Sequence, residues 1–408
     1  MLTTLAKGVK GGKWFSLIDK VYSMRNLRAS FVKVHENRGS AGVDHQTVEM
    51  FGGRLEKNLA QLSAAIQDRS YEPREIKRVW IPKPGSRTDK RPLGIPTVRD
   101  RVVQTALRNV IEPIFEVGFA EHSYGFRPGR GCKDALRRVA WLLKHGYPWV
   151  VDADLKSYFD TIPHERLLRR VEEKISDGRV LDLIAKFLTQ DVMDTVKTWT
   201  PERGTPQGAV ISPLLSNIYL DPLDHRMQRL GFKMVRYADD FVVMCRTEQE
   251  AQNALRALQE WTQAEGLELH PEKTCLVDAR QRGGFEFLGY HFERSYRWPR
   301  SKSLKKMKDS VRAKTRRANG HSLEFIIESL NLTLKGWFEY FKQCSRFVFP
   351  PLDQWIRMRI RSILRHNQGR HGRERSSDHQ RWPNAFFAKK GLFSLVEAHI
   401  EFCQSCRR

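Results

Sequence analysis

The spacing of apolar and polar residues changes along the chain and predicts two kinds of organisation. From 46 to 300, short apolar runs typical of strands alternate with segments in which apolar residues recur every three or four positions, as in amphipathic helices. After Trp298 the helical pattern prevails as far as 368. Three helices are predicted there, the first and third strongly basic, at 303–320, 322–344 and 350–368. The pattern therefore predicts an α+β part followed by an α-helical part.

Two of the predicted strands end in acidic residues. The run "WVVDADL" (149–155) carries Asp152 and Asp154 two positions apart, which places them on one face of a strand. The run "VRYADDFVVM" (235–244) predicts a hairpin whose turn contains Asp239 and Asp240. An isolated Asp–Asp pair is also common in solvated turns. Burying ionised carboxylates without a partner costs several kcal/mol, so two acid-tipped strands side by side indicate a bound cation.

Carboxylate oxygens gathered in this way are suitable ligands for Mg²⁺. Two such ions can bind the attacking and the leaving oxygen of an in-line phosphoryl displacement. The two strand ends therefore point to phosphoryl-transfer chemistry.

The segments around these strands predict a supporting loop and hairpin. "REIKRVWIPKPGSRTDKRPLGIPTVRDR" (74–101) is typical of a short hairpin with a basic tip. "RGTPQGAVISPLLSNIYLDPLD" (203–224) predicts a loop leading into a helix that Ser212 caps. We expect an antiparallel pair of strands at the centre of an α+β layout.

Charge indicates the kind of partner. The 408-residue chain has 71 Lys and Arg against 47 Asp and Glu, a formal net charge of +24, and the last quarter (301–408) carries more than half of the excess. Such a surplus favours nucleic acid as a partner over a merely solvated basic surface. No apolar run is long enough to span a membrane, the N-terminus lacks the apolar core of a secretory signal, and the six cysteines are mostly scattered, as in a reducing cytosol.

Several motifs together resemble a known family. "VDADLKSYFD", "GTPQGAVISPLLSNIYLDPLD", "YADD", "HPEKT" and "FLGYHF" follow one another in the order seen in reverse transcriptases. Upstream, "AGVD", "IPKPGSRTDKRPLGIPTVRDR" and "HSYGFRPGRG" resemble the group II intron reverse transcriptases, also called maturases, as does "WPNAFFAKKGLFSL" near the end. The resemblance extends from about Gly39 to Arg408.

The resemblance implies a right-hand polymerase fold and a division of the chain. It assigns 1–45 to an N-terminal extension and 46–300 to the fingers and palm, an antiparallel sheet with helices. It assigns 301–368 to an α-helical thumb, or maturase domain, and 369–408 to a linker and a small C-terminal element that resembles a DNA-binding element.

The family pattern also implies roles for individual residues. Asp154, Asp239 and Asp240 match its catalytic, metal-binding carboxylates, which would hold two Mg²⁺, whereas Asp152 lies outside the matched motif. The positions matched to nucleotide binding are Lys83, Arg91, Phe159, Gln207, Gly208 and Lys273. Phe159 would exclude rNTPs by a clash with the ribose 2′-OH, although a core aromatic is the alternative. Ala209 stands where a second glycine is more usual.

The third basic helix would contact RNA. Arg357, Arg361 and Arg365 are four positions apart and share one helical face, which suits a phosphate backbone, although solvated arginines would give the same pattern. The partners implied are group II intron RNA, an RNA template–DNA primer duplex, a DNA target and dNTPs, in the bacterial cytoplasm and at the nucleoid when DNA is engaged. Because the chain stops without an HNH nuclease domain, we do not expect second-strand cleavage.

We therefore expect an RNA-directed DNA polymerase that also promotes splicing and retrotransposition of its intron. Two alternatives remain: an RNA-binding splicing cofactor with a vestigial polymerase site, and a group II-like reverse transcriptase with a host repair or defence role. The intact Asp154, Asp239, Asp240, Phe159 and Gln207 argue against the first. An RNA-dependent RNA polymerase is disfavoured by Phe159.

Overall fold

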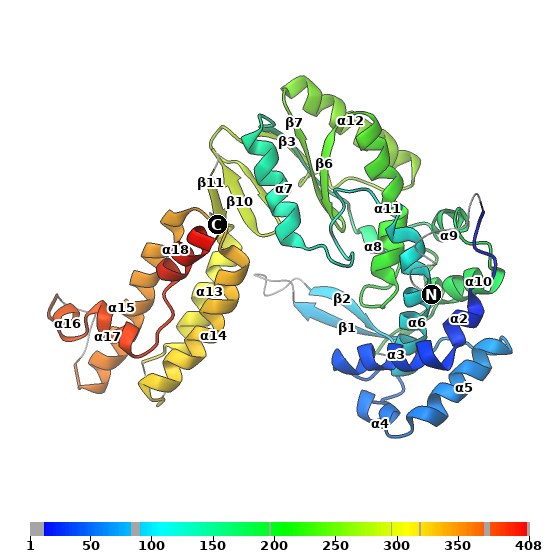
Figure 1. Ribbon diagram of the computed structural model, residues 1–408, viewed down its shortest axis with the longest axis horizontal. Helices are drawn as coiled ribbons and strands as arrows, with labels where there is room; N and C mark the ends of the chain where they lie inside the picture. The colour runs from blue at the N-terminus through cyan, green and yellow to red at the C-terminus, as the bar shows by residue number, and fades with distance from the viewer. Residues whose placement is uncertain are drawn as a thin grey trace. The chain divides into compact units, whose positions relative to one another are not determined.

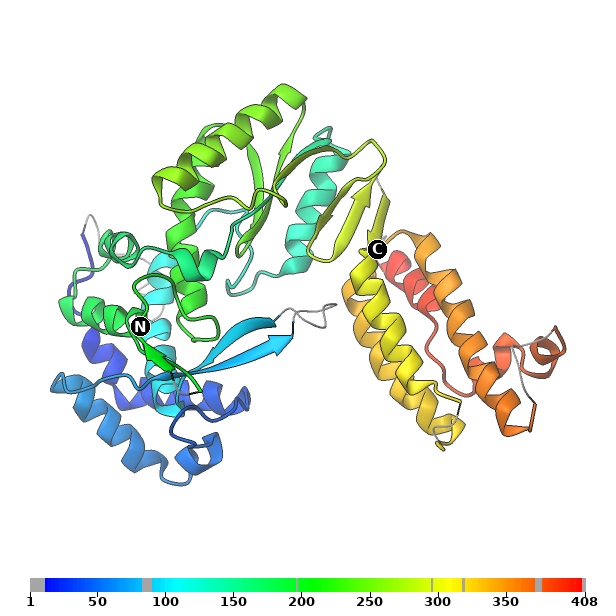
Figure 2. The ribbon, with the colours of Figure 1, turned by 180° about the vertical axis from the view of Figure 1, so that it is seen from behind.

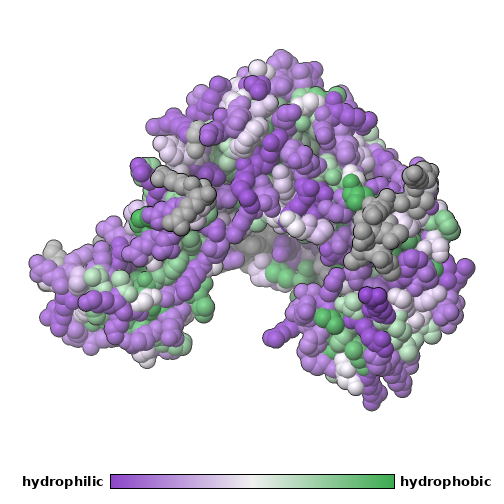
Figure 3. All heavy atoms as spheres, viewed as in Figure 1, coloured by the Kyte–Doolittle hydropathy of each residue, from purple (hydrophilic) through white to green (hydrophobic). Residues whose placement is uncertain are grey.

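The chain divides into two compact units. The computed structural model describes residues 12–82, 90–195, 197–294, 296–317, 320–370 and 376–405. The first unit is Met1–Val277 and the second is Asp278–Arg408 (Figure 1). Hydrophilic residues predominate on the face of the molecule shown in Figure 3. None of the described helices combines the length and the apolar character needed to cross a membrane.

The first unit is built around a central sheet of four strands in the order β6-β7-β3-β8. The strands are β6 (Lys233–Tyr237), β7 (Asp240–Cys245), β3 (Trp149–Asp154) and β8 (Cys275–Asp278). The pairs β6–β7 and β3–β7 are antiparallel. The predicted hairpin at 235–244 and the antiparallel pair at the centre of the fold are thus confirmed.

Helices cover both faces of the central sheet (Figures 1 and 2). Alternate strand residues such as Val151, Phe241 and Val243 join one large buried cluster with α11 (Ser212–Arg229) and α12 (Glu248–Ala264). The residues between them point to the other face, where α7 (Cys132–Lys144) packs against β6 and β7. This alternation puts Asp152, Asp154 and Asp240 on the face of α7.

A second sheet of the first unit has the strand order β2-β1-β4-β5. Its strands are β1 (Ile76–Pro82), β2 (Lys90–Ile95), β4 (Val192–Asp194) and β5 (Lys197–Trp199). The predicted hairpin of 74–101 is the antiparallel β1–β2 pair. The helices of this part are α2 (Ile18–Tyr22), α3 (Met24–Glu36), α4 (Val48–Gly52), α5 (Leu55–Gln67), α6 (Val98–Glu116), α8 (Tyr158–Thr161), α9 (His164–Glu172) and α10 (Gly178–Leu188).

The second unit combines a small sheet with helices. Its strands, in the order β11-β10-β9, are β9 (Phe285–Phe287), β10 (Tyr290–Glu293) and β11 (Tyr296–Pro299). Its helices are α13 (Ser301–Lys314), α14 (Leu323–Phe341), η1 (Arg346–Val348), α15 (Phe349–Asn367), α16 (Ser376–Arg381), α17 (Asn384–Lys389) and α18 (Leu395–Ser405). The three helices predicted after Trp298 are therefore confirmed as α13, α14 and α15.

The division of the chain differs from the sequence expectation in two places. The β9–β11 sheet, which was expected to belong to the part before 300, falls within the second unit. Tyr290 explains this, because its hydroxyl donates to the Tyr340 carbonyl of α14 and its ring packs against Phe341 at 5.1 Å between centroids. The described N-terminal residues do not form a separate extension, because α2 and α3 pack against α5 and α6.

Candidate active site

The acidic residues predicted at the strand ends lie together at one end of the central sheet. Asp154, the last residue of β3, stands directly opposite Asp240, the first residue of β7. Asp239 precedes Asp240 in the turn from β6, where Ala238 has a φ of +59°. All three carboxylates are partly buried. The structure thus brings together, from two strands 85 positions apart in the chain, the residues that the sequence pattern singled out.

The electrostatics of this acidic cluster (Asp154, Asp239 and Asp240) favour a cation. Burial raises the pKa of Asp239 above the usual aspartate range, and the neighbouring charge of Asp154 raises it further. The Lys273 ammonium donates to the Asp154 carboxylate in an ion pair, and the Asp154 carbonyl accepts from the backbone N–H of His270 at 2.7 Å. Lys273, predicted to act on phosphate, therefore contacts a predicted metal ligand.

The donor set fits a metal that takes further ligands from its substrate. Among the described residues, no three His, Cys, Asp or Glu side chains are arranged so that they would by themselves hold a metal ion. Mg²⁺ is usually bound by one or two carboxylates together with waters and substrate phosphates, rather than by a complete protein cage. Asp154 and Asp239, with their partly buried oxygens at the sheet end, match that mode of binding.

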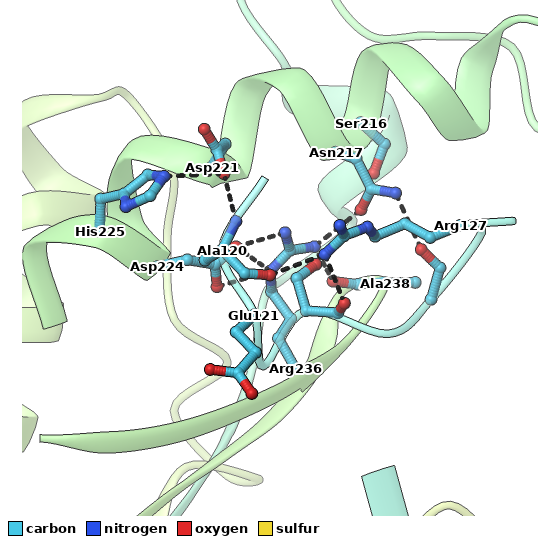
Figure 4. A network of polar contacts seen from close by, with 12 residues as sticks. Ala120, Glu121, Arg127, Ser216, Asn217, Asp221, Asp224, His225, Arg236 and Ala238 are labelled. Atoms are coloured by element: carbon cyan, nitrogen blue, oxygen red, sulfur yellow. Dashed lines mark hydrogen bonds and ion pairs between the residues drawn. The ribbon is translucent and has the colours of Figure 1, made fainter. Parts of the chain in front are cut away.

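A fully buried arginine holds the turn that carries Asp239 (Figure 4). Arg236, at 0% exposure, donates from Nη1 to the carbonyl of Ala238 and to Oδ1 of Asn217, both at 2.9 Å. Its Nε and Nη2 donate to the Asp224 carboxylate at 2.9 and 2.5 Å. Arg236 therefore ties the turn to two side chains of α11. Because Ala238 adopts a left-handed conformation that non-glycine residues rarely adopt, these bonds stabilise a strained backbone.

The "HSYGFRPGRG" segment packs against the same turn. The N–H of Tyr124 donates to the Arg236 carbonyl at 2.8 Å, and the N–H of Arg236 donates to the His122 carbonyl at 3.0 Å. Gly125 lies so close that a Cβ there would collide with the backbone nitrogen of Ala238. Its carbonyl accepts from Nδ2 of Asn217 at 2.8 Å. The motif glycine is thus required by a close backbone approach.

Sequence reasoning missed Arg236, Asp224 and Asn217. An arginine that directly follows the apolar pair Met234–Val235 of a strand was the available signal, because a buried arginine needs a buried acidic partner. The chain gives no local indication of which acidic residue that partner is.

Three of the residues matched to the nucleotide, Phe159, Gln207 and Gly208, lie in or beside the loop that precedes α11. Phe159 and Gln207 line one cavity of ≈490 Å³. Gln207 accepts at its carbonyl from the N–H of Gly94 at 2.6 Å, which ties the loop to β2. Gly208 has a φ of +108°, and a Cβ there would collide with the Gly94 carbonyl, so glycine is needed at this position.

Other expectations for this region have mixed outcomes. Arg91 is an exposed residue of β2, and Lys83 lies outside the described residues. Phe159 is half-buried, with its ring centroid 6.4 Å from that of Phe126, so part of its surface packs against protein. Ser212 is the first residue of α11 rather than its N-cap, which is Ile211, and its hydroxyl donates to the carbonyl of Pro206 at 2.9 Å.

The expected arginine track on α15 is wrong for two of its three members. Arg361 is 2% exposed and donates to the Trp382 carbonyl and to Oδ1 of Asn384, both at 3.0 Å. Arg365 is 6% exposed and pairs with the buried Asp378 at 2.8 Å. The shared face of these arginines points into the second unit, where α16 and α17 supply their partners. Arg357 is partly exposed.

Exposed cations of the second unit gather instead on α13 and just after it. They are Lys302, Lys305, Lys306, Arg312, Arg316 and Arg317. Arg312 and the half-buried Lys308 lie over the Trp355 ring of α15, at 5.7 and 5.8 Å from its centroid. These side chains form a basic surface on the first of the two helices that the sequence predicted to be strongly basic.

Comparison with known families gives two matches within the chain. The model described as "Reverse transcriptase (RNA-dependent DNA polymerase)" matches residues 81–292. The model described as "Group II intron, maturase-specific domain" matches residues 304–382.

Individual relatives are similar over part of their length. Protein YkfC of Escherichia coli (strain K12) is 41% identical over 187 residues, which cover 45% of this chain and 49% of that protein. Group II intron-encoded protein LtrA of Lactococcus lactis subsp. cremoris is 35% identical over 209 residues, 51% of this chain and 34% of that protein. The chain thus spans half or less of the length of these relatives. A solved structure of telomerase from Candida albicans with a fragment of telomeric RNA aligns with 86% of this chain and 70% of the telomerase chain. The sequence identity is 13% and the TM-score is 0.46.

Proposed function

Because the chain belongs to the reverse transcriptase family and contains a group II intron maturase domain, we propose that it copies RNA into DNA and also binds a group II intron RNA to promote splicing and retrotransposition. The observation that carries the polymerase part is the pairing of Asp154 with Asp240 beside Asp239 at one end of the central sheet. A carboxylate whose ionised form is disfavoured by burial and by a like charge is suited to a site completed by a cation.

The proposed reaction is attack of a primer 3′-OH on the α-phosphate of a dNTP, with release of pyrophosphate. Reverse transcriptases generally use divalent metal ions. Two Mg²⁺ held by Asp154 and Asp239 would supply positive charge to the attacking and leaving oxygens. Asp240, opposite Asp154 in the β-ladder, would support the geometry of the pair. No nucleophilic side chain is needed, because the primer hydroxyl is the nucleophile.

Several residues would orient the nucleotide. Arg91 and Lys83 would contact the triphosphate, and Gln207 and Gly208 would line the nucleotide position. Phe159, whose ring packs edge-on against Phe126 and Tyr158, would exclude a 2′-OH by its bulk. Lys273 would leave Asp154 when a cation binds and would then be free to contact phosphate.

The second unit would bind RNA through its basic surface. The exposed lysines and arginines of α13 would contact phosphates. Arg361 and Arg365 would instead stabilise the fold, because both make contacts inside the second unit. Intron RNA would be recognised chiefly by shape and backbone. The template–primer duplex and a DNA target would be further partners of the same complex.

Primer extension on an RNA template tests this proposal. Purified protein, an RNA template annealed to a DNA primer, dNTPs and Mg²⁺ should yield a DNA copy whose sequence follows the template, and rNTPs in place of dNTPs should yield little product. An unextended primer, with RNA binding intact, would refute the polymerase proposal and favour an RNA-binding splicing cofactor.

A further inference from the structure

Aromatic side chains gather on the solvent side of the β9–β11 sheet. Tyr296 and Trp298 of β11 have ring centroids 5.5 Å apart, and Phe347 of η1 lies 6.5 Å from Tyr296. His291 of β10, directly opposite Trp298 in the ladder, lies 6.2 Å from its ring. Tyr296, Trp298 and Phe347 therefore form a continuous group of rings, the aromatic platform.

The platform is more exposed than the fold requires. Tyr296 is 47% and Phe347 is 60% exposed. The opposite face of the same sheet holds Tyr290 and Phe292, which are almost completely buried in the core of the second unit. Because strand residues alternate between faces, the core is complete without the platform. Exposed apolar groups that are contiguous, unlike single ones, typically mark an interaction site.

The chemistry around the platform favours a nucleic acid ligand. The guanidinium of Arg346 lies 5.0 Å from the Phe347 centroid, and Arg294 is exposed in the turn between β10 and β11. The second unit carries 28 Lys and Arg against 12 Asp and Glu. The acidic residue that faces Tyr296 across the ladder, Glu293, has its carboxylate near His291 and the Gly283 N–H, at 3.5 and 3.2 Å. Aromatic rings interleaved with cations are the usual means of holding unpaired bases.

We propose that the aromatic platform is a stacking site for unpaired bases of RNA, with Arg346 contacting the adjacent phosphate. Proteins recognise single-stranded loops and bulges of RNA by stacking splayed bases on aromatic rings. The platform shares no residue with the acidic cluster or the nucleotide cavity. It depends on the proposed function only in taking RNA as the ligand.

The test is binding of a short unstructured RNA to the full chain. Fluorescence anisotropy with a labelled octamer should show that Tyr296→Ala and Phe347→Ala each weaken binding about tenfold, because each removes one base–aromatic stack. The salt dependence of binding should stay unchanged, because neither substitution removes a charge. Tyr296→Phe and Phe347→Tyr, which keep an aromatic ring, should retain wild-type affinity.

Matched controls separate stacking from other effects. Phe325→Ala removes a phenylalanine of the second unit whose exposure (52%) is close to that of Phe347 and which lies outside the platform, and it should leave affinity unchanged. Duplex RNA of the same length should bind the wild type and the two alanine variants alike, because its bases are unavailable for stacking.

Several results would overturn the proposal: wild-type affinity in both alanine variants, an equal loss for duplex RNA, or tighter binding of the matching DNA octamer. A concentration-dependent dimer that Phe347→Ala dissociates, with RNA affinity unchanged, would instead identify the platform as a protein interface. Since binding is measured without nucleotide addition, failure here is distinct from failure of the polymerase proposal.

Discussion

Arg236 stabilises the fold by pairing with Asp224 and holds the turn beside Asp239, and substitutions can separate these two roles. In Arg236→Met the Asp224 carboxylate stays buried without its partner. Breaking a buried pair in this way costs about 3–5 kcal/mol, a large share of the roughly 5–15 kcal/mol that stabilises a typical protein. With a shift of roughly 2–4 °C per kcal/mol for a unit of this size, the melting temperature should fall by about 6–20 °C.

The double variant Arg236→Met/Asp224→Leu tests whether the two effects are separate. Replacing both members of a buried pair with apolar residues is often neutral for stability, so the melting temperature should return close to the wild type. The Ala238 carbonyl still lacks its donor, and the left-handed turn is free to relax. Because a displacement of about 1 Å at a reacting centre costs about 100-fold in rate, nucleotide addition should stay about 100-fold slow in both variants.

Thermal melting and single-turnover addition of one dNTP measure the two effects. A useful control is Asp177→Ala, since this buried carboxylate accepts from the N–H groups of Leu17 and Ile18 and makes no contact with the turn. The control should lower the melting temperature and keep the wild-type rate at temperatures below melting. A double variant with both wild-type stability and wild-type rate would show that Arg236 serves the fold alone.

Three further outcomes are expected. Burial and Asp154 raise the pKa of Asp239, so its ionised form destabilises the metal-free fold. The variant Asp239→Asn should therefore have a higher melting temperature than the wild type in EDTA at pH 7. This difference should disappear below about pH 4, where the wild-type carboxyl is protonated too. Lys273→Gln removes an exposed ion-pair partner of Asp154, worth at most about 1 kcal/mol, and should tighten Mg²⁺ binding by no more than about fivefold in a melting titration. Arg365→Met should lower the melting temperature and leave unchanged the slope of log binding constant against log salt concentration for RNA, whereas Lys305→Gln should reduce that slope by about one. A reduced slope in Arg365→Met and an unchanged slope in Lys305→Gln would show that the α15 arginines contact RNA.

The acidic cluster was predictable because its determinants are local. Strand alternation fixes which of Asp152, Val151 and Asp154 share a face, and a hairpin turn fixes where Asp239 and Asp240 lie. The family motifs then indicated that the two strands are neighbours, and the Asp154–Asp240 register confirms that they are.

The arginines of α15 show where periodicity is insufficient. A four-residue spacing establishes that Arg357, Arg361 and Arg365 share a face, but it does not tell whether that face meets solvent. The answer depends on the partners of these arginines, Asp378 and the Trp382 carbonyl, which come later in the chain than α15. The Arg236–Asp224 pair was hidden for the same reason, since the partner belongs to another element.

The measurement that bears most directly on the central claim is the single-turnover rate of dNTP addition on an RNA template as a function of Mg²⁺ concentration, in the wild type and in Asp154→Ala and Asp239→Ala. We predict a wild-type rate that rises more steeply than first order in Mg²⁺, and loss of addition in both variants with RNA binding retained. Addition at the wild-type rate by either variant would contradict the assignment of the active site to these strand ends.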